Sequence, residues 1–271
     1  MTSSIPETLR NVKALTFDVF GTAVDWHTSV SQELVKQAQE KTTSPAYDSL
    51  PGALRERLER ITAEDWARFA YEWRLTYYYF TRSFVPGESK WKDVDTHHYD
   101  SLNDLLSKWE LAGTYTDEEV RSLSLVWHKL KPWDDSSEGI KRLGTRLTTA
   151  TLSNGNQSLL HDLNTYGDLS FRRIISTADF GAYKPHPSTY LGAAEALGLR
   201  PDEVAMVAAH LADLAAARSN GLRTIYVERP QEESWSPEEK RYKEAREWVD
   251  IWVADGEDGF LEVAKRLGIS E

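Results

Sequence analysis

The sequence predicts an α/β protein: a doubly wound parallel (Rossmann-like) sheet with an inserted all-helical cap domain. Beyond Pro132, short apolar runs alternate with helical segments, whereas the stretch before it shows helical periodicity and no convincing strand. Strict alternation of strand and helix implies parallel strands joined by right-handed crossovers. A first strand also precedes the helical stretch. We therefore expect an α/β core of residues 1–26 and 132–271 and a helical cap of residues 27–131.

The first expected strand is the apolar run that begins at Ala14 and ends in Asp18, and Gly21 follows it closely. A buried strand that ends in a carboxylate and breaks at a glycine places this carboxylate at the strand's C-terminal edge. Open α/β sheets bind their ligands at that edge. Asp18 is therefore the first candidate for a catalytic residue.

The cap is expected to consist of amphipathic helices joined by polar loops. Thr62 and Asp65 have the spacing of a capping box, and aromatic and alanine residues follow them at helical intervals. Thr116 and Glu119 have the same spacing before a later helix. Segment 42–52, which holds two prolines, is expected to be a loop. The expected cap helices are 27–41, the one that begins near residue 62, 98–111 and 117–129.

The rest of the core is expected to alternate strand and helix to its end. The expected strands are 147–152, 173–176, 203–208, 222–227 and 250–253. The expected helices are 136–143, 158–166, 188–197, 211–220, 237–248 and 256–267.

Composition restricts the classes of partner. With 43 acidic and 32 basic residues the formal charge is −11, which argues against nucleic acid because phosphate backbones need a basic face. There is no cysteine, which excludes disulfides and thiol chemistry and is compatible with a reducing compartment. No apolar run approaches the ~18 residues of a membrane span, and the N-terminus has no signal pattern. We expect a cytoplasmic protein with no membrane partner.

Polar residues follow the expected strands and should converge, because parallel strands end at one edge of the sheet. These residues are Asp18, Ser153, Asn154, Lys184, His210 and Asp213. Such a set can perform covalent catalysis: one carboxylate attacks and forms an ester, the lysine keeps it ionised, and the second carboxylate activates water.

The segments FDVFGT, LSNG, YKPHPSTY and AAHLADLAAARSNGLRT resemble, in order and spacing, the four motifs of the haloacid dehalogenase superfamily. Most members are magnesium-dependent phosphatases with a second Asp two residues after the nucleophile, where this chain has Phe20. The fourth segment offers Asp213 without a paired acidic residue, whereas Mg²⁺ prefers several oxygen ligands. Halide needs no proton to leave, so the chain most resembles L-2-haloacid dehalogenase (type II), and we expect neither metal nor cofactor.

This resemblance implies the hydrolysis of a small 2-halocarboxylate to a 2-hydroxy acid. Asp18 would attack the α-carbon and expel halide, and water near Asp213 would then cleave the Asp18 ester. A homodimer is implied as well. The remaining implied roles are Thr22 steadying the Asp18 loop, Ser153 holding the substrate carboxylate, Lys184 neutralising the anionic cluster, Tyr190 bracing it, and Arg74 (after Trp73) and Asn154 contacting the halide.

The fourth segment departs from typical members at two positions, where Ala208 and His210 replace Ser and Asn. His210 beside Asp18 would alter the substrate pocket, although a structural histidine is the commoner case. Arg74 lies at the edge of an aromatic stripe, where an arginine often simply extends to the surface. Two alternatives remain open: a Mg²⁺-dependent phosphatase that tolerates Phe20, and a non-catalytic homologue that binds a small carboxylate.

Overall fold

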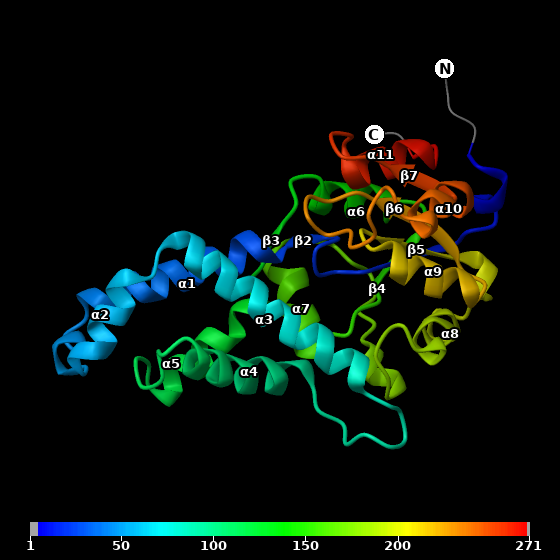
Figure 1. Cartoon of the computed structure of the whole chain (residues 1–271). Helices are drawn as coiled ribbons and strands as arrows, with labels where there is room; N and C mark the ends of the chain where they lie inside the picture. The colour runs from blue at the N-terminus through cyan, green and yellow to red at the C-terminus, as the bar shows by residue number, and fades with distance from the viewer. Residues whose placement is uncertain (1–4, 270–271) are drawn as a thin grey trace. The chain divides into compact units, whose positions relative to one another are not determined.

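The computed structural model describes residues 5–269 and divides the chain into two compact units (Figure 1). An α/β unit contains the described residues up to Asp25 together with those from Lys131 onward. A helical unit spans Trp26–Leu130. The predicted fold class, a parallel sheet with an all-helical insertion, is confirmed.

The sheet of the α/β unit has five parallel strands in the order β4-β1-β5-β6-β7. Phe17 of β1 is paired with Thr151 of β4 on one side and with Val207 of β5 on the other. The chain thus builds β4 on one side of β1 and then β5 on the other, so strand order reverses around β1. Ligands bind at such a switch point. The strands are β1 (Ala14–Phe17), β4 (Thr148–Thr151), β5 (Val204–Ala208), β6 (Arg223–Val227) and β7 (Ile251–Val253).

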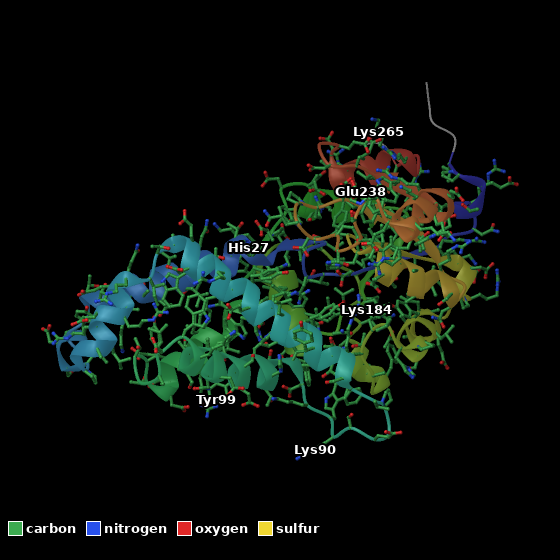
Figure 2. The ribbon with its side chains drawn as sticks, in the orientation of Figure 1. His27, Lys90, Tyr99, Lys184, Glu238 and Lys265 are labelled. Carbon is green, nitrogen blue, oxygen red and sulfur yellow. The ribbon has the colours of Figure 1, made fainter. Side chains whose placement is uncertain are left out.

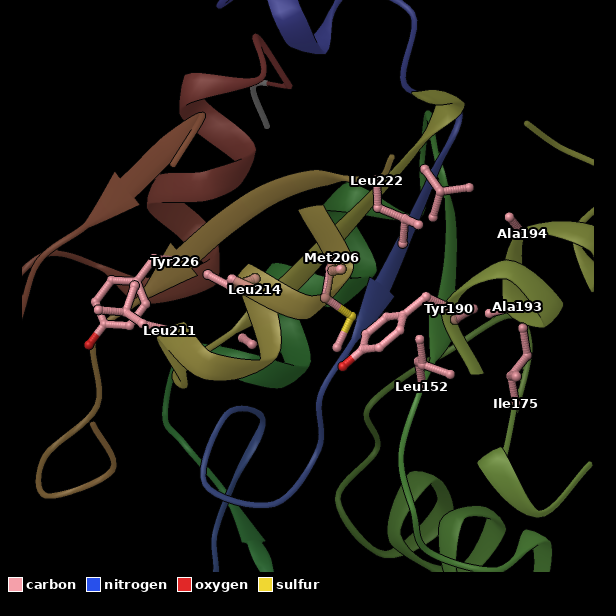
Figure 3. Packing of buried hydrophobic residues seen from close by; sticks show 14 of the residues in the cluster. Leu152, Ile175, Tyr190, Ala193, Ala194, Met206, Leu211, Leu214, Leu222 and Tyr226 are labelled. Atoms are coloured by element: carbon pink, nitrogen blue, oxygen red, sulfur yellow. The ribbon is translucent and has the colours of Figure 1, made fainter. Parts of the chain in front are cut away.

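Helices cover both faces of this sheet, because successive side chains of a strand point to opposite faces. The Thr16 hydroxyl lies 3.3 Å from the Met206 sulfur on the face packed by α8, α9 and α10. Figure 3 shows Met206 beside Tyr190 in this cluster. On the other face, the Phe17 ring meets Phe260 of α11 edge-on at 5.2 Å. The helices are α6 (Ser136–Leu143), α7 (Gln157–Tyr166), α8 (Pro187–Ala196), α9 (Leu211–Ser219), α10 (Lys240–Trp248) and α11 (Gly259–Arg266).

Segment 173–176, expected as a strand, makes only isolated bridges to its neighbours, so this prediction is wrong. The Thr151 hydroxyl accepts from the Ile175 amide at 2.9 Å and donates to the Ile175 carbonyl at 3.0 Å. A side chain therefore satisfies backbone groups that a strand ladder would otherwise pair. An antiparallel pair that the sequence did not predict, β2 (Val24–Asp25) and β3 (Lys131–Pro132), lies where the chain leaves and re-enters the unit.

The helical unit contains helices as its only regular elements among the residues that the structure describes. Both predicted capping boxes are present, at Thr62 with Asp65 and at Thr116 with Glu119. The helix expected at 98–111 begins earlier because the Asp93 side chain accepts from the Thr96 amide. The helices are α1 (Trp26–Thr43), α2 (Gly52–Arg60), α3 (Ala63–Ser83), α4 (Val94–Lys108) and α5 (Asp117–Ser124), the last continued as a 3₁₀ turn over Leu125–His128.

The aromatic stripe of α3 lies mostly in the interior of the helical unit. Trp73 is fully buried, and its indole NH donates to Ser101 of α4 at 3.0 Å. Its ring meets that of Trp127 edge-on at 5.3 Å. None of the helices within residues 5–269 is long and apolar enough to cross a membrane.

Candidate active site

Asp18 follows β1 directly, and its carboxylate is surrounded by donors. Lys184, labelled in Figure 2, places its Nζ 2.9 Å from Oδ1. The Thr22 hydroxyl donates to Oδ2 at 2.8 Å, and Nδ1 of His210 lies 3.1 Å from the same oxygen. Asp18 is itself only 8% exposed. The structure thus brings together the first, third and fourth of the sequence segments around one buried carboxylate.

Burial alone would raise the pKa of Asp18, but the charge of Lys184 and the hydrogen bond and charge of His210 outweigh it and hold the pKa well below its usual range. Burial alone would lower the pKa of Lys184, but the charges of Asp18 and Asp213 and their hydrogen bonds outweigh it and raise the pKa above its usual value. Both groups are therefore ionised at neutral pH. An ionised carboxylate is the form that can act as a nucleophile.

The second carboxylate, Asp213 in the first turn of α9, is engaged at both oxygens. Lys184 Nζ lies 2.6 Å from Oδ2, and the Tyr190 hydroxyl donates to Oδ1 at 2.6 Å. Burial, together with Asp213, raises the pKa of Tyr190 well above its usual value, so its hydroxyl stays protonated. Lys184 is thereby fixed between two carboxylates, one of which is braced by a buried phenol.

Thr22 connects the loop after β1 with the end of β5. Its hydroxyl accepts from the Ala209 amide at 2.9 Å while it donates to Asp18. The turn before it uses Gly21 at φ +83°, a conformation that glycine adopts without strain. The Asp18 loop is therefore held by a side chain at its far end.

The residues after β4 play different parts in the structure. The Asn154 side-chain carbonyl accepts from the Lys184 amide at 2.8 Å and from the Thr177 hydroxyl at 3.0 Å, so it holds the lysine loop. The Ser153 hydroxyl accepts from the Gly155 amide at 3.4 Å, and no hydrogen bond joins it to Asp18 within the described residues. Phe20 is buried, and the edge of its ring lies next to Gly155.

Two site residues, Arg229 and Glu232, were not predicted from the sequence because they lie in the irregular loop after β6. Oε2 of Glu232 lies 3.1 Å from Nε2 of His210, and it packs so closely on Gly21 that a Cβ there would be 2.0 Å away. Nε of Arg229 donates to the Thr22 carbonyl at 3.0 Å. One signal could have found them: β6 ends at the same edge of the sheet as β1 and β5.

His210 is held between two carboxylates. Burial opposes protonation of its ring, but hydrogen bonds to and charges of Asp18 and Glu232 raise the pKa of His210 to about 10. The imidazole is therefore cationic at neutral pH. Asp18 consequently faces two cations, Lys184 and His210, on different sides of its carboxylate.

Arg74 lies on α3 in the helical unit. Its guanidinium carbon is 4.6 Å from the ring centre of Tyr77 and 5.6 Å from that of Trp26. These contacts stack the guanidinium on aromatic faces, which is typical of arginine. Its halide contact stays a prediction.

The donor set around Asp18 does not suit a divalent cation. The Lys184 ammonium itself lies between the carboxylates of Asp18 and Asp213, whereas Mg²⁺ requires several oxygen ligands in an octahedral array. Within the described residues, no group of three or more His, Asp and Glu side chains is arranged to hold a metal.

Comparisons with known proteins agree with this architecture. The family model for haloacid dehalogenase-like hydrolases matches residues 12–221. The (S)-2-haloacid dehalogenase 1 of Pseudomonas sp. (strain CBS-3) is 28% identical over 233 residues, which cover 84% of this chain and 90% of the relative. The solved structure of a defluorinating L-2-haloacid dehalogenase is similar with a TM-score of 0.78 at 30% identity, covering 97% of this chain and 98% of that one.

A second solved structure, of another L-2-haloacid dehalogenase, gives a TM-score of 0.75 at 30% identity, covering 93% of this chain and all of that one (100%). The superfamily resemblance predicted from the four segments is thus confirmed. This chain belongs to the haloacid dehalogenase-like hydrolase family.

Proposed function

We propose that this protein hydrolyses small 2-haloalkanoic acids to 2-hydroxy acids through a covalent ester on Asp18. One observation carries the proposal: a buried, ionised carboxylate is held by Lys184 and Thr22, and Phe20 stands two residues after it. The relatives named (S)-2-haloacid dehalogenase support the choice of substrate class.

In the first step, an Asp18 oxygen attacks the α-carbon of the substrate and forms a C–O bond. The carbon–halogen bond breaks, and the halide leaves with its electron pair. Backside attack inverts the carbon. A stable anion needs no proton to leave, so the apolar Phe20 at this position fits the reaction, whereas a phosphoester's alkoxide would need an acid.

In the second step, water near Asp213 attacks the carbonyl carbon of the Asp18 ester. The bond between that carbon and the ester oxygen, which the first step attached to the substrate α-carbon, breaks. The 2-hydroxy acid leaves with this oxygen, and the water oxygen restores the Asp18 carboxylate. The Lys184 charge stabilises the Asp18 carboxylate before ester formation and after ester hydrolysis. Asp213, which accepts a hydrogen bond from Tyr190, holds the Lys184 ammonium in place.

The remaining roles are inferred from chemistry and family resemblance. Ser153 and nearby main-chain amides would bind the substrate carboxylate. Asn154 uses its carbonyl oxygen on the Lys184 loop, so its amide NH₂ is the group that would donate to the halide, together with Arg74. The homodimer and the cytoplasmic location stay predictions.

The test uses monochloroacetate and L-2-chloropropionate in the presence of EDTA. The wild-type protein should release halide, and Asp18→Asn should reduce release to background because it removes the nucleophile. Asp202→Asn, which changes a surface carboxylate before β5 at the opposite edge of the sheet, should keep the wild-type rate.

A single turnover in ¹⁸O-labelled water should place label in the Asp18 carboxylate, read by peptide mass. Absence of label and of halide release, with no activity on phosphomonoesters, would indicate a binding protein. Activity only on phosphomonoesters with Mg²⁺ would instead establish a phosphatase and contradict the proposal.

A further inference from the structure

The displacement step does not use the imidazole of His210, although this ring lies directly beside the reacting carboxylate. Nδ1 is 3.1 Å from Asp18 Oδ2, and Nε2 is 3.1 Å from Glu232 Oε2. The His210 side chain is 27% exposed, whereas those of Asp18 and Glu232 are 11% and 9% exposed. The ring therefore reaches solvent, and both of its carboxylate partners are largely shielded.

Asp213 is poorly placed to take a proton from water. Its Oδ2 lies 2.6 Å from the Lys184 ammonium, and its Oδ1 accepts from Tyr190 at 2.6 Å. Both carboxylate oxygens of Asp213 are therefore already occupied by strong hydrogen-bond donors, a cation and a phenol. Ester hydrolysis consequently calls for a different base.

We propose that His210 accepts the proton of the water that hydrolyses the Asp18 ester, and that Glu232 is the positioning residue that holds the imidazole through Nε2. This inference rests on the proposed function, because it requires the ester. In this arrangement the base, His210, lies next to the reacting Asp18, and the carboxylate of Glu232 orients the base from its other ring nitrogen.

Formation of the ester itself would convert His210 into a base. In the resting protein the ring faces two anions, Asp18 and Glu232, which keep it protonated. When Asp18 becomes an ester it loses its charge, so one of the two anions disappears and the imidazolium is less favoured. The Nδ1 proton then passes to solvent, and Nε2–H remains on Glu232.

Other charged groups near the ring are already paired. Glu233 accepts from the amide of Leu211 at 2.7 Å, and Lys184 lies on the Oδ1 side of Asp18. Asp213, in the first turn of α9, is bound to Lys184. The charge that changes next to His210 during the reaction is therefore that of Asp18.

Nδ1 of neutral His210 takes a proton from the attacking water while the water oxygen bonds to the Asp18 carbonyl carbon. The tetrahedral intermediate expels the ester oxygen bonded to the substrate α-carbon, and this oxygen takes the proton from Nδ1 and leaves as the hydroxyl of the product. The new carboxylic acid returns its proton to Nδ1, which restores the ion pair between Asp18 and His210.

The first experiment compares His210→Gln with the wild type in rapid-quench reactions with L-2-chloropropionate. We expect the variant to release one halide per site and then to stall, with the Asp18 peptide carrying the mass of the ester. Ester hydrolysis should slow by about 10²–10⁴-fold, the usual contribution of a general base. A variant that hydrolyses the ester as fast as the wild type would overturn the inference.

The second experiment tests Glu232 through the pH profile of ester hydrolysis in single turnovers. Glu232→Gln removes the anion that favours the imidazolium, so the acidic limb of the profile should move to lower pH. Glu233→Gln, a matched change at the next residue, should leave the limb in place. A merely structural Glu232 would lower the rate at every pH without this shift, and that result would contradict the positioning role.

Failure of the two proposals can be told apart. If the wild type releases no halide and takes up no label, the proposed function fails. If it turns over normally while His210→Gln accumulates no ester, the dehalogenase assignment stands and the role of His210 is wrong.

Discussion

At the scale of single residues, Thr22 shows how tightly the nucleophile is held. The residue is completely buried, and its one hydroxyl donates to Asp18 and accepts from the Ala209 amide. Asp18 lies four residues before Thr22, whereas Ala209 belongs to a distant segment that meets Thr22 only in the folded protein. Loss of this hydroxyl would leave a buried N–H without its acceptor and a carboxylate without one of its donors.

We expect Thr22→Val to lower the free energy of unfolding by about 1–3 kcal/mol, because a nearly isosteric methyl group leaves these buried polar groups unsatisfied. Urea denaturation followed by circular dichroism would measure it. Thr22→Ser keeps the hydroxyl and should recover most of the loss. Equal losses in both variants would show that the methyl group matters more than the hydrogen bonds.

At the scale of elements, the loop after β6 connects three parts of the α/β unit. Arg229 donates to the Thr22 carbonyl and, through both terminal nitrogens, to Asp135 before α6, at 2.6 and 2.8 Å. Glu232 contacts His210, and Glu233 accepts from Leu211 at the start of α9. This loop thus fixes the side of the site away from Lys184.

The ion pair of Arg229 with Asp135 is nearly buried, with side chains 7% and 14% exposed. We expect Arg229→Met to destabilise the protein by about 3–5 kcal/mol, because an unpaired carboxylate remains in the interior. The double variant with Asp135→Asn removes both charges and should lose clearly less than the sum of the single losses. Chemical denaturation of all four proteins gives this coupling. Simple additivity would show that the pair is not coupled.

At the scale of the whole molecule, the sheet was predictable because apolar strands and helices alternate strictly. The meeting of Asp18, Lys184 and Asp213 was predictable because residues that follow parallel strands share one edge. Glu232 was not predictable, since its contact with His210 depends on the path of an irregular loop that no periodicity describes. The wrong strand at 173–176 has a similarly local cause, the hydroxyl of Thr151.

The helical unit begins and ends at neighbouring points of the α/β unit. In the antiparallel pair of β2 and β3, Asp25 is opposite Lys131 and Val24 is opposite Pro132. The chain therefore leaves and returns across a gap that a tight turn can close. We propose that the helical unit is a cap domain inserted into an α/β core that can fold without it.

A shortened chain tests this proposal, with residues 26–130 replaced by Asn-Gly between Asp25 and Lys131. This dipeptide favours the two-residue turn of an antiparallel hairpin. We expect cooperative urea unfolding, because the sheet, both helical layers and the contacts of Asp18 all lie within the retained residues. A deletion of equal length over 36–140 removes β3 and most of α6, and it should not fold. The first variant also lacks Arg74, for which we propose the halide contact, so its halide release should fall to background. A non-cooperative transition in the first variant would show instead that the core needs the helical unit in order to fold.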